Sequence, residues 1–435
     1  MISQTPASAG HARNVPLFIA FRVLFNARWY YPVLSIIFLD LGLTLEQYAL
    51  LNVAWAISIV CLEVPSGALA DQIGRKWMLV VAAAVMVAEL AILAFTPSQS
   101  AWLFPLCLLN RILSGAAEAS ASGADEALAY DSLPPDGRDT AWPAVLLRLM
   151  RWQSAGFFIA MLVGAAVYDP SFVQRAADFF GFDVTVSRES TMRFPIYLTL
   201  MNAILALGVT LRFVEPGTTG DRPKASVGAT LHGIKAAGGW IVRTPMVLVI
   251  LLGGLCLDSF IRLFLTVGSN FYRLVGLPEA SFGLVGSGFA IIGFFIPRLA
   301  QALVARRSLF SNFFLTAALG FTGLVGIAQA WPGWGILCVI PVGVAISLLG
   351  FFFSHYLNTR VTDSSRRATV LSFKGLCFNL GYGAAGLGFA AASRALEKGD
   401  PNQTFAAVLG WMPGAFAAGV VIVSIASARL LRGST

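Results

Sequence analysis

Charged side chains interrupt several long apolar stretches of this chain, and their spacing suggests that they act in groups. Arg111, Glu118 and Asp125 follow one another at intervals of seven residues, which places them on one stripe of a helix. Asp258 and Arg262 are four residues apart and are direct neighbours on a helix. A charge inside a membrane is costly unless it is paired or hydrated. These residues are therefore candidates for binding a charged substrate or for exchanging a proton.

The three charges in the stretch 101–131 need partners on other helices. Seven residues of helix span about 10.5 Å along the axis, which strains direct pairing. The stretch 140–168 runs back antiparallel and carries Arg148 and Arg151 one turn apart. A static ion-pair network and a role in proton transfer are equally open for this group. We expect the two arginines to neutralise acidic residues of the first stretch, namely Glu118, Asp125 or Glu126.

The elements that hold these charges are predicted to be membrane-spanning helices. Hydrophobic residues make up 57% of the 435 residues and charged residues only 12%, whereas a soluble domain has about 25% charged residues. Several windows of about 20 residues are almost wholly apolar, which is the length that crosses a bilayer as a helix. Strands of a membrane barrel would instead alternate polar and apolar residues. The sequence therefore predicts an all-α membrane protein.

Twelve spans are predicted, and short connections between them favour antiparallel neighbours. Within the span 140–168, Gly156, Ala160 and Gly164 repeat every four residues, and small residues at this spacing let helices approach closely. The predicted spans are 16–39, 47–70, 77–97, 101–131, 140–168, 193–213, 245–272, 281–303, 309–330, 332–358, 367–396 and 404–430.

The basic residues orient these spans. With the N-terminus inside, 16 of the 30 lysines and arginines fall in inside segments or at the adjoining span ends, and 6 in the corresponding outside positions. This excess predicts that both termini are cytoplasmic. The longest inside connection separates six spans from six, so we expect an N-terminal six-helix bundle over 1–213 and a C-terminal six-helix bundle over 245–435. The second half of the linker 214–244 could form a short amphipathic helix at the membrane face.

Two short segments resemble motifs of the major facilitator superfamily (MFS). The loop GALADQIGRK, residues 67–76, resembles the signature loop between that family's second and third helices, and RILSG, residues 111–115, resembles its fourth-helix motif. The resemblance implies the MFS fold, with 12 transmembrane helices in two six-helix bundles around a central cavity. It also implies secondary transport by alternating access.

The signature loop is expected to be a cytoplasmic gate. Gly67 and Gly74 allow a tight turn and close helix approach, and Asp71 suits the N-terminus of a neighbouring helix. The resemblance implies that this helix is the eleventh, which starts near Arg366. It also implies that Arg75 pairs with Asp131 at the cytoplasmic end of the fourth span. A solvated loop that only anchors topology is the alternative. The expected gate residues are Gly67, Asp71, Gly74, Arg75 and Asp131.

The same resemblance implies that spans one, four, seven and ten line the central cavity. Arg28 in the first span, Arg111 and Arg262 would then present positive charge, which favours an anionic or zwitterionic substrate. Lys374 opens the eleventh span and is expected to extend toward the cytoplasm. The expected residues for substrate binding or ion coupling are Arg28, Arg111, Glu118, Asp125, Asp258 and Arg262.

The energy source is expected to be an ion gradient. The chain has no GxxxxGK[ST] nucleotide-binding loop, and carboxylates inside the membrane point to protons. We expect proton-coupled export of a small organic molecule by antiport across the inner membrane, and the alternative is proton-coupled uptake of an organic anion or zwitterion. The glycine–proline pair of the family's drug–proton antiporters is lacking in span five, which argues against a multidrug assignment.

Other classes of protein fit the sequence poorly. The three histidines do not stand with cysteines or carboxylates at ligand spacing, and the five cysteines all fall in apolar stretches. We therefore expect no enzyme activity, no metal and no cofactor. A receptor is disfavoured because the loops are too short to hold a signalling domain. The expected partners are the substrate, protons and the lipid bilayer, without nucleic acid, and the protein is expected to act as a monomer.

Overall fold

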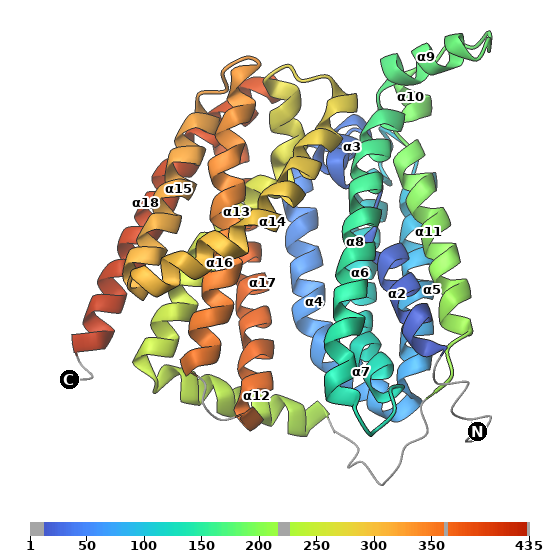
Figure 1. The fold of residues 1–435 in the computed structure, drawn as a ribbon. Coiled ribbons are helices and arrows are strands. Elements are labelled where there is room, and N and C mark those ends of the chain that lie inside the picture. The colour runs from blue at the N-terminus through green and yellow to red at the C-terminus, as the bar shows by residue number, and fades with distance from the viewer. Residues whose placement is uncertain (1–12, 216–226, 361–363, 433–435) are drawn as a thin grey trace. The chain divides into compact units, whose positions relative to one another are not determined.

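The chain is seen in a computed structural model, which describes residues 13–215, 227–360 and 364–432. Over these residues the chain forms helices joined by turns, with no strand. The elements in chain order are α2 (Asn14–Asn26), η1 (Tyr31–Val33), α3 (Leu34–Asp40), α4 (Leu45–Ile73), α5 (Arg75–Phe95), α6 (Leu103–Ala121), α7 (Ala124–Asp131), α8 (Arg138–Tyr168), α9 (Pro170–Phe179), α10 (Arg188–Thr191), α11 (Phe194–Leu211), α12 (Val227–Val242), α13 (Pro245–Leu274), η2 (Glu279–Ser281), α14 (Phe282–Arg306), α15 (Leu309–Ala328), η3 (Trp334–Cys338), α16 (Val339–Arg360), α17 (Ser364–Ala395) and α18 (Pro401–Arg432) (Figure 1).

Most of the predicted spans are long apolar helices. Among the described residues, nine helices are long and apolar enough to cross a membrane, or ten if the pair bent by 42° within 279–306 counts as one span. The remaining two predicted spans are interrupted. The span 16–39 is divided into α2, η1 and α3, and the span 101–131 is divided into α6 and α7. The fold is thus the expected all-α membrane fold, with two of its spans broken.

The described residues divide into two compact units. Unit 1 contains the residues up to Val33 and those from Ile57 to Thr230, and unit 2 contains Leu34–Ala56 and the residues from Leu231 onward. Unit 2 therefore includes a segment from the part of the chain that we expected in the first bundle. The helix predicted in the second half of the linker 214–244 is α12.

Small residues allow the helices of unit 1 to approach closely. In this unit α5 packs against α6 and α11, and α2 packs against α8 and α11. A Cβ atom added to Gly164 of α8 would lie 1.7 Å from the Trp29 carbonyl oxygen, and one added to Gly156 would lie 2.9 Å from Val23. Glycine is required at position 164 because no side chain fits there. The small residues of α8 make the close approach that their spacing predicts.

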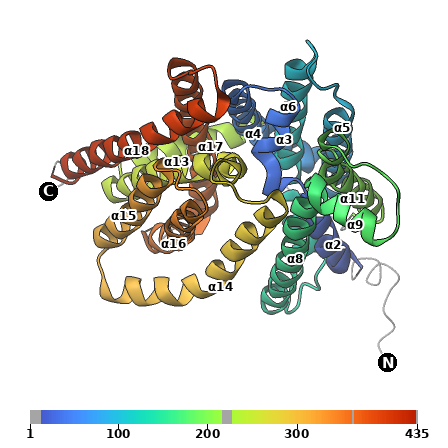
Figure 2. The ribbon, with the colours of Figure 1, turned by 90° about the horizontal axis from the view of Figure 1, so that it is seen from above.

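Unit 2 is built around α13, which packs against α16, α17, α18 and also α3. Its neighbour α15 packs against both α16 and α18, as the views along two directions show (Figures 1 and 2). Large apolar side chains such as Phe353, Phe378 and Val247 form a buried cluster among these helices. This packing places the polar faces of α13 and α17 beside each other.

Candidate functional site

A break in the first span places Arg28 inside unit 1. The chain leaves α2 after Asn26, and the backbone groups that the break frees are bonded by α11. The Asn202 side chain donates to the Ala27 carbonyl at 2.9 Å, and the Trp29 amide donates to the hydroxyl of a threonine, Thr199, at 3.0 Å. Such breaks are tolerated in a membrane only where the protein itself satisfies the backbone.

The Arg28 guanidinium is the centre of a buried polar network. Only 4% of Arg28 is exposed, and its Nη1 donates to the Tyr30 hydroxyl at 2.9 Å and to Glu89 Oε1 at 3.1 Å. The same nitrogen lies 3.4 Å from the Ser114 hydroxyl. Its Nη2 lies 3.9 Å from Glu118 Oε2. Since 42% of the Glu118 side chain is exposed, this carboxylate connects the network to an accessible surface.

Glu89 of α5 is the buried counter-charge of this network. It is 1% exposed, and Asn110 of α6 donates to both its carboxylate and its backbone carbonyl. Arg111 is also buried and interacts electrostatically with the Glu89 carboxylate. The formal charges of this group balance, with Arg28 and Arg111 against the carboxylates of Glu89 and Glu118. A neutral, hydrogen-bonded group is the form in which charge is stable inside a membrane.

The predicted arrangement of Asp125 is wrong. Gly123, at φ 76°, ends the helical path, so that Asp125 starts α7 and does not continue the stripe of Arg111 and Glu118 on α6. Asp125 is 1% exposed and pairs with Arg22 of α2 at 2.9 Å, which also lies 3.8 Å from Glu126.

The predicted partners Arg148 and Arg151 are also wrong. Both are exposed on α8, and the Arg148 Nε donates to a carbonyl of its own helix, that of Ala144, at 3.5 Å. The guanidinium groups that meet Glu118 and Asp125 come instead from the first span, at Arg28 and Arg22.

The expected gate residues lie around the start of α5. Arg75 forms an ion pair with Asp131, as predicted, and it also donates to the Ala127 carbonyl at 2.8 Å. A second arginine, Arg138, lies 3.5 Å from the same carboxylate. These contacts join the starts of α5 and α8 to the end of α7. Their role as a gate stays a prediction.

The Glu215 carboxylate holds the turn before α5, and the sequence does not predict this contact. Gly74 has φ 97°, and the amides of Arg75 and Lys76 donate to the two oxygens of Glu215 at 3.0 and 2.8 Å. A Cβ atom on Gly74 would lie 3.0 Å from this carboxylate. A carboxylate at a helix N-terminus satisfies free amides and complements the helix dipole.

The other two gate residues lie on α4. Gly67 and Asp71 are both exposed there. The turn and close helix approach predicted at Gly67 are wrong, because α4 continues through it to Ile73 and no heavy atom lies within 4 Å of an added Cβ atom. The expected partner of Asp71 near Arg366 lies outside the described side chains, so that contact stays a prediction.

In unit 2, α13 carries the predicted pair of Asp258 and Arg262. The two side chains form an ion pair, as the spacing of four residues predicts. Arg262 also donates from Nη1 to the Asn379 amide oxygen of α17 at 3.1 Å, and its guanidinium lies 5.3 Å from the ring centre of Tyr382. The pair is thus held by a second helix.

A cavity of about 400 Å³ in unit 2 includes this pair. Lys374 of α17 also lines it, and its expected extension toward the cytoplasm stays a prediction. Its ammonium lies 4.6 Å from the Phe353 ring centre and 5.4 Å from that of Phe378. Two cationic groups and one carboxylate leave the wall with one excess positive charge. The lining residues are Asp258, Arg262, Ile346, Leu349, Gly350, Phe353, Lys374, Gly375, Phe378 and Asn379.

Several residues of these sites are missing from the sequence-based set, namely Arg22, Glu89, Asn110, Glu215 and Asn379. A polar residue inside an apolar span is a signal for four of them, all except Glu215, because burial of such groups requires partners. The identity of the partner depends on which helices are adjacent, and chain spacing does not contain that information.

Paired charges inside the spans of a helical membrane protein are typical of membrane transporters. The family model of the Major Facilitator Superfamily matches residues 17–386. The chain therefore belongs to this family of transporters, as the two motifs indicated. No curated protein matches the chain.

Solved structures of transporters share the fold. A crystal structure of a mutant of the nucleoside transporter NupG matches with a TM-score of 0.73 and 15% identity, over 96% of this chain and 99% of that chain. A bacterial homologue of the human lysosomal transporter Spinster, in an inward-facing and unoccupied conformation, matches with a TM-score of 0.69 and 15% identity, over 98% and 97%. A POT family transporter in complex with 5-aminolevulinic acid matches with a TM-score of 0.64 and 14% identity, over 95% and 96%. At these identities the likeness shows the fold alone.

Proposed function

We propose that the protein is a secondary active transporter that moves a small organic molecule across the cell (inner) membrane by alternating access, coupled to protons. Export by antiport is the first candidate, and uptake of an organic anion or zwitterion by symport is the second. Membership of a transporter family and the charged groups inside both units support transport. The excess of basic residues in the predicted inside segments supports cytoplasmic termini, and we propose that the protein acts as a monomer.

The charged cavity of unit 2 carries the proposal on the substrate. Arg262 and Lys374 contribute two positive charges against the single carboxylate of Asp258. Asn379 adds an amide, and Phe353 and Phe378 add apolar walls. A carboxylate or phosphate on an organic substrate would complete this charge balance, because Arg and Lys are strong donors to such groups. The cavity therefore favours an anion or a zwitterion.

The pair of Asp258 and Arg262 offers a physical link to protons. Protonation of Asp258 would release Arg262 for an anionic substrate, so that proton and anion bind together. Joint binding of a proton and an anion favours symport. Glu118 offers the opposite link, because its half-exposed carboxylate could bind either a proton or a cationic group of the substrate. That competition favours antiport, and a zwitterion could use both sites.

The direction is tested by flux into proteoliposomes with an imposed pH gradient. The purified full chain is screened against organic acids, amino acids and cationic drugs. Antiport accumulates substrate when the lumen is acidic, whereas symport accumulates it when the outside is acidic. Flux that does not change when the gradient is collapsed would exclude proton coupling.

The site is tested by Lys374→Gln, with Lys235→Gln as the matched control because Lys235 is an exposed lysine of α12 in the same unit. Loss of one charged hydrogen bond to the substrate predicts a flux of organic acid that is lower by about tenfold or more. The control is expected to leave flux unchanged. Equal flux in both variants would remove the cavity from the proposal.

A further inference from the structure

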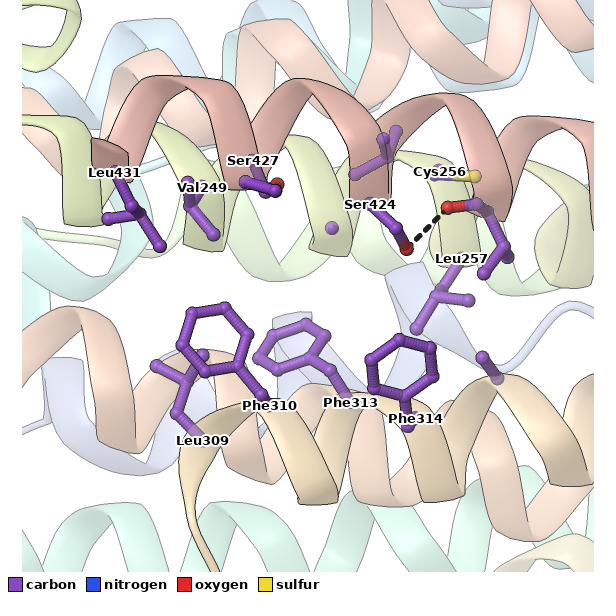
Figure 3. A pocket seen from close by; sticks show the side chains of 15 residues that line it. Val249, Cys256, Leu257, Leu309, Phe310, Phe313, Phe314, Ser424, Ser427 and Leu431 are labelled. Atoms are coloured by element: carbon purple, nitrogen blue, oxygen red, sulfur yellow. Dashed lines mark hydrogen bonds between the residues drawn. The ribbon is translucent and has the colours of Figure 1, made fainter. Parts of the chain in front are cut away.

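A second cavity of unit 2 is separate from the charged one and has a different chemistry. It has a volume of about 330 Å³ and lies between α13, α15 and α18 (Figure 3). Phe310, Phe313 and Phe314 of α15 face Val249 of α13 across it. The hydroxyl of Ser424, which also lines it, donates to a carbonyl of its own helix at 2.7 Å. The cavity is thus suited to a hydrocarbon group and not to a polar substrate.

The length of the cavity matches one leaflet of a bilayer. Its lining runs from Leu309 to Ala317 on α15 and from Val420 to Leu431 on α18, which corresponds to about 12 Å and 16 Å of helix. The hydrocarbon core of a bilayer is about 30 Å thick, so that one leaflet contributes about half of this. A smaller hollow of about 260 Å³ continues from it and shares Phe314 in its lining.

Arginines gather at one end of this cavity. Leu309 and Leu431 lie together at that end (Figure 3). Arg306 ends α14 and Arg307 follows it in the short turn before α15. Arg429 and Arg432 lie in the last turn of α18 with Leu431 between them. All four arginines are exposed. The distribution of basic residues predicts that this end faces the cytoplasm.

We propose that the cavity holds an acyl chain of an anionic phospholipid, whose phosphate is bound by these four arginines. The hydrophobic effect contributes nothing to binding of the acyl chain, because the bilayer that the chain leaves is as apolar as the cavity. An empty cavity would still lose dispersion contacts, which a lipid chain restores. The preference for one lipid over another then comes from the phosphate and headgroup charge near the arginines. The site is independent of the proposed substrate cavity, since the two share no lining residue.

The proposal is tested by native mass spectrometry of the delipidated full chain. The chain is supplied with phosphatidylglycerol or with phosphatidylcholine of the same acyl chains. We expect one retained phosphatidylglycerol and weaker retention of phosphatidylcholine. The double variant Arg306→Gln/Arg307→Gln is expected to bind phosphatidylglycerol about 30-fold more weakly, with little change for phosphatidylcholine. The matched control is Arg13→Gln/Arg212→Gln, which removes two exposed arginines of unit 1 and is expected to change neither.

A cavity-filling variant tests the acyl-chain part separately. Ala428 lines the cavity and is exposed, so that Ala428→Phe fills the space without displacing a buried side chain. It is expected to abolish retention of both lipids. Equal retention of the two lipids by the unmodified chain would overturn the proposal. The same holds if the control variant weakens phosphatidylglycerol as much as the arginine variant does, or if Ala428→Phe leaves retention unchanged.

Discussion

Arg273 of α13 forms a bidentate ion pair with Asp40 of α3, with Nη1 to Oδ1 at 2.6 Å and Nη2 to Oδ2 at 2.8 Å. The same guanidinium binds Glu279 at 2.6 Å. Further hydrogen bonds tie the segment 34–56 to α13. The hydroxyls of Ser35 and Ser269 lie 2.6 Å apart, and the Tyr48 hydroxyl donates to the Thr266 carbonyl at 2.9 Å. These contacts explain why a segment from early in the chain belongs to unit 2.

Replacement of Arg273 by alanine is expected to destabilise this attachment. The change would leave Asp40 and Glu279 side by side without their shared cation, and a lost charged hydrogen bond costs about 1.5–3 kcal/mol. We expect a lower midpoint of thermal unfolding in detergent. Arg273→Lys should restore only part of the stability because lysine cannot bind a carboxylate with two parallel bonds. Arg394→Ala, at an exposed arginine of α17, is the control and should unfold like the unmodified chain.

The pair of Arg28 and Glu89 predicts a coupled effect on stability. Arg28→Ala alone leaves Glu89 buried and unpaired, which is expected to lower the free energy of unfolding by about 3–5 kcal/mol. Glu89→Ala should have a similar effect for the same reason. The double variant removes both charges and should be more stable than the sum of the single changes implies. Chemical unfolding of the four proteins measures this coupling, and additive losses would show that the two charges act independently.

A side chain at position 164 is expected to clash with the backbone at the break in the first span. In Gly164→Ala the new Cβ atom would meet the Trp29 carbonyl, so that α8 must move away from the break. We expect a loss of about 1–3 kcal/mol in the free energy of unfolding. Gly208→Ala is the matched control, because no heavy atom lies within 4 Å of a Cβ atom there. Its stability should stay the same or rise by up to about 1 kcal/mol, since alanine favours a helix. Equal losses in both variants would contradict the steric explanation.

The sequence was sufficient for the fold and for local pairs. Continuous apolar windows predicted the spans, and the spacing of Asp258 and Arg262 predicted their ion pair because both lie on one helix turn. The resemblance to a family motif predicts the pair of Arg75 and Asp131. In each of these cases the information is contained in a short segment or a known pattern.

The sequence does not predict the ion pairs and helix breaks that depend on contacts between segments far apart in the chain. Glu89 pairs with a residue 61 positions away, and no local pattern distinguishes Arg28 from Arg148 as the partner of an acidic residue on α6. The break between α2 and α3 contains Pro32, which disfavours a continuous helix but does not reveal which residues satisfy the freed backbone. It exists because Asn202 and Thr199 bond the freed backbone and because Gly164 leaves room for it. Interrupted spans are for this reason harder to predict than continuous ones.

Replacement of Asp71 is expected to affect substrate flux without affecting the stability of the protein. Its side chain is exposed on the last turn of α4, whereas the neighbouring pair of Arg75 and Asp131 holds α5 to α7. Asp71→Asn should therefore leave insertion and thermal stability unchanged. If Asp71 acts in the proposed cytoplasmic gate, the same variant should abolish substrate flux, because asparagine has no charge to interact with a helix dipole.

Asp136→Asn is the matched control for this prediction, since Asp136 is an exposed aspartate in the turn before α8 of the same unit. Flux in proteoliposomes and the amount of inserted protein are measured for both variants. Normal flux in Asp71→Asn would assign the charged segment 67–76 to membrane topology alone. Lost flux in both variants would indicate a general need for negative charge at this surface, and only a loss confined to Asp71→Asn supports a specific gate contact.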